Sequence, residues 1–168
     1  MKTTPIEAAG PSSAPVVIGV QSAGSPAARA LIAALDDDLL RRYPGRVIRG
    51  IDIDNFEASG GFFAVAEVDG LPVACGGFRP FEGSIEVKRM YTLPAFRRRG
   101  IARAMLRFLG EEAARQGFER AVLETGDHQP EAIGLYLSAG WQQIETFGPH
   151  IGDPASVCFE TLVDRMRR

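Results

Sequence analysis

Cysteine, histidine and tryptophan are scarce in this chain of 168 residues, which contains two, two and one of them respectively. Cys75 and Cys158 each lie within an apolar, strand-like run, which favours reduced, buried thiols over a disulfide framework. Histidines, cysteines and carboxylates form no cluster with metal-ligand spacing, so the sequence predicts no metal site. A hydrolase is also unsupported, because neither histidine has an evident triad partner and no G-x-S-x-G elbow occurs.

Long hydrophobic runs and a strong net charge are missing as well. No stretch is apolar enough to span a membrane, and the first 15 residues lack the apolar centre of a signal peptide. We therefore interpret residues 1–15 as a disordered tail, and expect a cytoplasmic protein without a membrane partner. Because the formal net charge is only -2, the arginine-rich segment described below is a local feature, and no nucleic-acid partner is expected.

The rest of the composition is that of one folded domain. Hydrophobic residues make up 45% and charged residues 24% of the chain, which supplies enough apolar material for a core. No internal repeat is found. The expected organisation is a single domain over residues 16–168.

Short apolar, β-prone runs predict strands in both halves of the chain. Two of these runs are joined by Asp69-Gly70, a dipeptide that favours the type I′ turn of an antiparallel hairpin. The next run extends this hairpin into a three-stranded meander. Strands are predicted at residues 16–20, 62–68, 71–78, 84–93, 121–123, 141–147 and 157–162.

Three segments between these strands have apolar residues at helical spacing. Ser25 and Pro26 supply an N-cap and a first-turn residue for the first helix. The second helix begins after Gly100 and ends near Gly117, and the third begins at Pro130. The order of strands and helices predicts an α/β fold with a mixed, mainly antiparallel sheet flanked by helices.

The most informative stretch, R-R-R-G-I-A, lies between the fourth predicted strand and the second predicted helix. A helix that begins at a glycine has unpaired N–H groups and a partial positive charge at its first turn, which stabilise a bound anion. Guanidinium groups add donors that suit phosphate oxygens. The loop is therefore suited to a pyrophosphate, although a basic run before a helix is also common on solvated surfaces. Its residues are Arg97, Arg98, Arg99, Gly100, Ile101 and Ala102.

The spacing Arg97-x-x-Gly100-x-Ala102 resembles the coenzyme A signature of the GNAT N-acetyltransferase superfamily. A second stretch, Q-P-E-A-I-G-L-Y-L-S-A-G-W from Gln129 to Trp141, is similar to the family's last helix and the strand that follows it. The order of predicted elements matches as well, so the resemblance covers nearly everything after residue 15. It implies an N-acetyltransferase that moves an acetyl group from acetyl-CoA, its co-substrate, to a primary amine of a small molecule, amino acid or peptide.

The resemblance also implies where the coenzyme lies. In the family, the strand before the glycine loop and the strand after the next helix splay apart, and pantetheine enters the gap. By position, the backbone of Met90, Tyr91 and Thr92 would hold pantetheine and polarise the thioester carbonyl. Gln129 stands where many members have asparagine, and this departure leaves its contact with pantetheine open.

Three residues are candidates for proton transfer. Tyr136 matches the family's acid position, and a phenol with an ordinary pKa of about 10 stays protonated at neutral pH. Glu86 and Glu124 compete as the group that takes the amine proton, and each could instead be a salt-bridged glutamate. Lys88 and Arg89 are expected on opposite faces of their strand, where one could attract a carboxylate of the substrate.

Two other functional classes share features with this sequence. A non-catalytic module that binds or senses acyl-CoA would have the same fold and stays open. A nucleotide-binding protein could use the arginine loop, but the G-x-x-x-x-G-K-[ST] and G-x-G-x-x-G patterns are missing. The sequence identifies neither the acceptor amine nor the oligomeric state, although a homodimer through the C-terminal strands would fit the resemblance.

Overall fold

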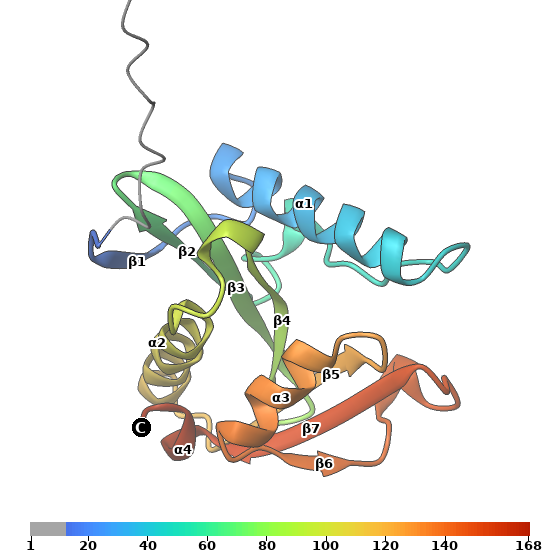
Figure 1. Ribbon diagram of the computed structural model, residues 1–168. Coiled ribbons are helices and arrows are strands. Elements are labelled where there is room, and N and C mark those ends of the chain that lie inside the picture. Colours follow the sequence, from blue (N-terminus) through green and yellow to red (C-terminus); the bar gives the residue numbers. More distant parts are fainter. Residues whose placement is uncertain (1–12) are drawn as a thin grey trace, which may run out of the picture.

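The computed structural model describes residues 13–168, and in these residues seven strands form one sheet in the order β1-β2-β3-β4-β5-β7-β6 (Figure 1). Most of the tail predicted for residues 1–15 lies outside the described residues. The strands are β1 (Val16–Val20), β2 (Phe62–Val68), β3 (Leu71–Phe81), β4 (Ser84–Thr92), β5 (Arg120–Gly126), β6 (Gln142–Ile144) and β7 (Ser156–Leu162). The helices are α1 (Pro26–Arg42), α2 (Ile101–Arg115), α3 (Pro130–Ser138) and α4 (Val163–Met166), and short 3-10 turns lie at Ile53–Asn55, Pro94–Phe96 and Gly148–His150.

The predicted α/β class and the mainly antiparallel sheet are confirmed. Strands β4 and β5 run parallel, and the other neighbouring pairs of the described sheet are antiparallel. The strand predicted over residues 141–147 is shorter than expected. Trp141 donates its N–H to the carbonyl of Tyr136 at 3.0 Å and so completes the end of α3 instead of joining the sheet.

Two tight turns fix the register of the β2–β4 meander. Asp69 and Gly70 have φ of 52° and 75°, and two positive φ values are characteristic of the predicted type I′ turn. Glu82 and Gly83 have φ of 46° and 78° and join β3 to β4 in the same way, although the sequence did not single them out. The three strands are therefore held antiparallel by local geometry.

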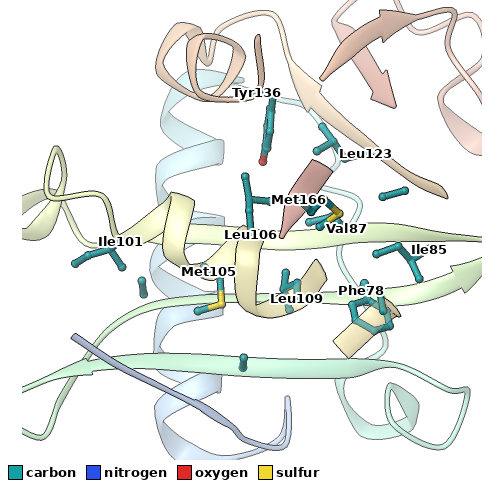
Figure 2. Close-up of a cluster of buried hydrophobic side chains, with 14 of the residues drawn as sticks. Phe78, Ile85, Val87, Ile101, Met105, Leu106, Leu109, Leu123, Tyr136 and Met166 are labelled. Atoms are coloured by element: carbon teal, nitrogen blue, oxygen red, sulfur yellow. The ribbon is translucent and has the colours of Figure 1, made fainter. Parts of the chain in front are cut away.

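The sheet has a helix on each face (Figure 1), and strand alternation sends neighbouring residues to opposite sides. Phe63 and Val65 of β2 pack with α1, whereas Ala64 and Ala66 belong to the cluster beneath α2. Figure 2 shows this second cluster, in which α2 supplies several of the labelled side chains. The packing of both helices fixes the two sheet faces around β4.

Strand β4 contains a β-bulge, which changes the direction of its second half. Cys75 of β3 pairs with Tyr91, but Gly77 pairs with Lys88, so β4 has one extra residue in this interval. Arg89 lies there with φ of 58°, an uncommon value for a residue with a side chain. The bulge bends β4 just beyond its contact with β5.

The pairing between β4 and β5 is short. It joins Ile85 to Ala121, Glu86 to Val122 and Val87 to Leu123, and the strands pair no further. Beyond this point β5 continues along β7, to which it is paired as far as Gly126 and Ser156. The sheet therefore opens between the second half of β4 and the end of β5.

The end of β5 is tied to the end of α1 by aromatic packing and several hydrogen bonds. The N–H of His128 donates to the hydroxyl oxygen of Tyr43 at 2.7 Å, and the two rings stack with centroids 5.0 Å apart. A Cβ added at Gly126 would overlap this hydroxyl oxygen and would lie 2.6 Å from the ring carbon that bears it. The absence of a side chain at Gly126 therefore permits this joint.

Gly126→Ala is expected to lower the free energy of unfolding by roughly 1–3 kcal/mol, because packed neighbours must move to admit the methyl group. Gly134→Ala is the matched control, since a Cβ at this position in α3 meets nothing within 4 Å. Alanine is the better helix residue, so the control is expected to raise the free energy of unfolding by roughly 0.5–1 kcal/mol. Urea denaturation measures both, and an equal effect of the two substitutions would contradict the packing account.

Candidate active site

A cleft of about 540 Å³ lies where β4 and β5 separate. It is bounded by the second half of α1 and residues 45–49, by β4 and β5, by the first turns of α3, and by residues from His150 to the start of β7. Four of the residues predicted for the site line it together: Met90, Glu124, Gln129 and Tyr136. The sequence had placed these residues in three different segments.

The remaining β4 residues predicted to contact the coenzyme, Tyr91 and Thr92, lie at the end of β4, before the loop that leads to α2. Tyr91 is buried in the cluster beneath α1. The carbonyl of Thr92 accepts a hydrogen bond of 2.9 Å from Nε of Arg97, whose guanidinium also lies 5.6 Å from the centroid of the Tyr91 ring. Arg97 thus braces the loop against the strand, and its positive charge stays close to the first turn of α2.

The first turn of α2 has the geometry of an anion site. Gly100 caps the helix in the left-handed region, with φ of 76° and ψ of 7°, and no side chain caps the first turn. A Cβ at Gly100 would meet nothing within 4 Å, so the space in front of the helix is open. Ile101 is buried and anchors the turn in the core. The first-turn N–H groups and the helix dipole are therefore presented to this open space.

Two further arginines flank this turn. Arg98 has φ of 63°, which turns the chain sharply before the helix, and the guanidinium of Arg99 lies 5.3 Å from the ring centroid of Phe96. Ala102 follows Ile101 and is only partly buried. The basic segment predicted to hold pyrophosphate is thus folded around the N-terminus of α2.

Tyr136 enters the core from α3. Its ring centroid lies 5.7 Å from that of Trp141 and 5.8 Å from that of Phe159, and its hydroxyl group points into the cluster in Figure 2. Burial, with a smaller effect from the charge of Glu124, raises the pKa of Tyr136 above its usual value. The hydroxyl group therefore stays protonated, and Tyr136 is also one of the residues that line the cleft.

Glu86 is completely buried, and it does not line the cleft. Arg79 lies 3.0 Å and Lys88 3.3 Å from its carboxylate oxygens. Burial alone would raise the pKa of Glu86, but His150, Lys88 and Arg79 together lower it to about 2. A carboxylate with such a pKa holds protons weakly, so these contacts favour a structural anion over a proton acceptor.

Glu124 has the opposite environment. Its side chain is 26% exposed at the end of β5, and the hydroxyl group of Ser156 donates to one carboxylate oxygen at 2.9 Å. Burial raises its pKa above the usual value, against the opposing effects of Ser156, His150 and Lys88. Glu124 also lines the cleft with Tyr136, so it is the better placed of the two glutamates to accept a proton.

His150 is a cleft residue that the sequence did not single out. It is 1% exposed, and its Nε2 lies 3.7 Å from Oε1 of Glu86 while its Nδ1 lies 3.9 Å from Oε2 of Glu124. Neither ring nitrogen has a hydrogen-bond partner among the described residues. No local pattern marks this histidine, because its partners are on β4 and β5 and are far from it in the sequence.

The basic residues around the cleft are arranged differently from the prediction. Lys88 and Arg89 were expected on opposite faces of β4, but the bulge brings both to the cleft, so that expectation is wrong. Arg89 is paired with Asp36 of α1 at 2.7 Å. Across the cleft, Arg46 lies 2.7 Å from the carboxylate of Asp153.

The side chain of Gln129 lies close to Tyr43. The pKa of Tyr43 is raised by burial, and hydrogen bonds with His128 and with the Gln129 side chain oppose this shift. Gln129 also lines the cleft at the start of α3, and its contact with a coenzyme stays a prediction. The side-chain amide of Gln129 thus contacts Tyr43 at the end of α1.

Both cysteines are free and buried, as predicted, and burial raises the pKa of Cys75 to about 12. Within residues 13–168, no group of three or more His, Cys, Asp or Glu side chains is arranged to hold a metal ion. In the same residues, none of the helices has the length and hydropathy needed to cross a membrane.

Comparison with known proteins agrees with this geometry. The model of the acetyltransferase (GNAT) family matches residues 28–141. A protein of Azospirillum brasilense named IAA acetyltransferase is 35% identical over 132 residues, which cover 77% of this chain and 86% of that protein.

Solved structures show the same fold. A Klebsiella pneumoniae protein, assigned provisionally as an acyl-CoA N-acyltransferase, has a TM-score of 0.76 and 28% identity, covering 88% of this chain and 97% of the other. An Elizabethkingia anophelis GNAT acetyltransferase, solved with acetyl-CoA bound, has a TM-score of 0.64 and 17% identity, with coverage of 88% and 97%. The family match spans both the strands that separate and the loop before α2, and the chain therefore belongs to the GNAT acetyltransferase family.

Proposed function

We propose that this protein transfers an acetyl group directly from acetyl-CoA to a primary amine of a small molecule, amino acid or peptide. The observation that carries the proposal is the gap between β4 and β5: a cleft lined by Glu124 and Tyr136 lies at this gap, and β4 continues beyond it toward the open N-terminus of α2. Family membership supports the acyl-CoA-dependent chemistry, and the cleft supports a second substrate beside the thioester.

The coenzyme would lie along the second half of β4. The β4 edge that faces β5 has no partner strand there, so its peptide groups are open to the amide groups of pantetheine at Met90. The pyrophosphate would lie against the first-turn N–H groups after Gly100, with the charges of Arg97, Arg98 and Arg99 nearby. Gln129, at the start of α3, faces the same gap.

The proposed reaction requires a base, an acid and no covalent enzyme intermediate. The amine nitrogen bonds to the acetyl carbon, its proton passes to Glu124, and the C–S bond then breaks. The hydroxyl group of Tyr136 donates a proton to the departing sulfur, and the phenolate regains a proton from water when the products leave. Because burial keeps this hydroxyl group protonated but disfavours the phenolate, donation must accompany C–S cleavage.

The charges of the cleft favour an acceptor that also carries a carboxylate. Arg46 and Arg49 line the wall opposite β4, and they share the single carboxylate of Asp153 at 2.7 Å and 4.0 Å. Both arginine side chains are about half exposed, so they can reach a substrate. An amino acid or a similar zwitterion would place its carboxylate there and its amine near Glu124.

The coenzyme site is tested by calorimetric titration of acetyl-CoA into the wild type and Gly100→Glu. The variant is expected to lose binding, because a carboxylate then occupies the space in front of the α2 N-terminus. Gly117→Glu is the matched control: Gly117 has a positive φ of 87°, and its Cβ would also meet nothing within 4 Å. Retained affinity in Gly100→Glu, or equal loss in both folded variants, would contradict the proposed coenzyme site.

The chemistry is tested by measuring thiol release from acetyl-CoA with a panel of amines. Amines that bear a carboxylate are expected to react faster than simple polyamines, and the reverse order would rule out the proposed role of Arg46 and Arg49. With the best acceptor, Tyr136→Phe is expected to lower turnover roughly 10²- to 10⁴-fold, because the thiolate then departs without a proton donor. Full turnover in Tyr136→Phe would remove this residue from the mechanism.

Coenzyme binding without acetylation of any amine would instead favour an acyl-CoA sensing module.

A further inference from the structure

His150 is a buried polar side chain without a hydrogen-bond partner among the described residues. Both ring nitrogens are shielded from solvent, and neither lies within hydrogen-bonding geometry of a partner in residues 13–168. Two buried polar atoms left unpaired lower the stability of a folded protein, so their presence calls for an explanation such as a catalytic role. The apolar contact of His150 is the edge-on ring of Phe147, with centroids 5.5 Å apart, which fixes the plane of the imidazole.

The two nitrogens face two different carboxylates. Nε2 is 3.7 Å from Oε1 of Glu86, an atom that is itself buried without a hydrogen bond, and Nδ1 is 3.9 Å from Oε2 of Glu124. Glu86 is held as an anion by Arg79 and Lys88. A neutral imidazole in this position presents its Nε2–H to Glu86, which leaves the lone pair of Nδ1 directed at Glu124.

We propose that His150 is a positioning residue for the acetyl transfer, one that accepts at Nδ1 the proton that Glu124 takes from the amine, while Glu86 holds the ring through Nε2–H. The inference rests on the proposed function, since it assigns a destination to the amine proton. The transfer requires the Glu124 carboxylate to move so that the 3.9 Å between Oε2 and Nδ1 shortens to a hydrogen-bond distance. The proton leaves the amine nitrogen, passes through Glu124 to His150, and returns through the partly exposed Glu124 to water after the product departs.

The arrangement gives the protonated imidazole two anionic neighbours, which offset the cost of burying its charge. Lys88, 3.3 Å from Glu86, acts in the opposite sense and keeps the net charge of the cluster low. The charged and titratable groups around the cluster are Glu86, Lys88, Arg79, Glu124, Asp153, Cys158 and Tyr136. Because His150 takes the proton, the Glu124 carboxylate is again deprotonated and can accept a proton from the next amine.

The geometry is tested first by NMR of the full chain with ¹⁵N-labelled histidine. The sequence contains two histidines, so His128→Gln identifies the ring signals of His150. Glu86→Gln and Glu124→Gln are each expected to shift those signals, because each removes a charge that faces one ring nitrogen. Glu160→Gln is the control, since this glutamate lies on the neighbouring strand β7 and is paired with Arg120. Shifts no larger than those of the control would overturn the proposal.

The role in transfer is tested by kinetics with His150→Gln and His150→Asn. The proposal predicts that His150→Gln lowers turnover roughly 10²-fold and alters the acidic limb of the pH–rate profile, while its affinity for acetyl-CoA stays near that of the wild type. His150→Asn, whose short amide can hydrogen-bond Glu124 but cannot accept its proton, should be as slow as His150→Gln. The double variant with Glu124→Gln should be no slower than Glu124→Gln alone, because the two residues act on one proton.

The failure of this inference differs from a failure of the proposed function. Unchanged turnover and pH dependence in folded His150→Gln would overturn the role of His150 while leaving acetyl transfer intact. Loss of coenzyme affinity together with turnover would also overturn it, since a general structural role predicts that result. If the wild type acetylates no amine, the proposed function fails, and the histidine signals alone decide whether the three side chains are coupled.

Discussion

The early separation of β4 from β5 is the constraint on which the site depends. Parallel strands need a crossover, and α2 supplies it, so the end of β4, the loop and the helix N-terminus are continuous in the chain. The strands pair at only three positions, and the bulge at Arg89 bends β4 beyond them. Peptide groups left open by the separation need partners, and in our proposal the amide chain of pantetheine supplies them.

The second constraint is the buried charge of Glu86. An isolated carboxylate in the core would be strongly destabilising, and Arg79, Lys88 and His150 together offset that cost. The two glutamates differ in their pKa values. The neighbours of Glu86 lower its pKa to about 2, whereas burial raises the pKa of Glu124. Two carboxylates whose environments push their pKa values apart can take different roles in one site.

Features fixed by local chemistry could be predicted from the sequence. The Asp69-Gly70 turn and the start of α2 at Gly100 depend on residues that are adjacent in the chain. The bulge at Arg89 and the cleft position of His150 could not be predicted, because each depends on contacts between distant segments. The coenzyme and catalytic roles of the predicted residues stay proposals, although several of these residues share one cleft.

Amide hydrogen exchange, measured with and without acetyl-CoA, tests most directly whether the gap between β4 and β5 holds the thioester. Exchange is predicted to slow at residues 88–92 and 100–103, where peptide groups gain partners, and to stay unchanged in β1 and β2, which lie away from the gap. Slowing confined to other segments, or no slowing at saturating acetyl-CoA, would contradict the account.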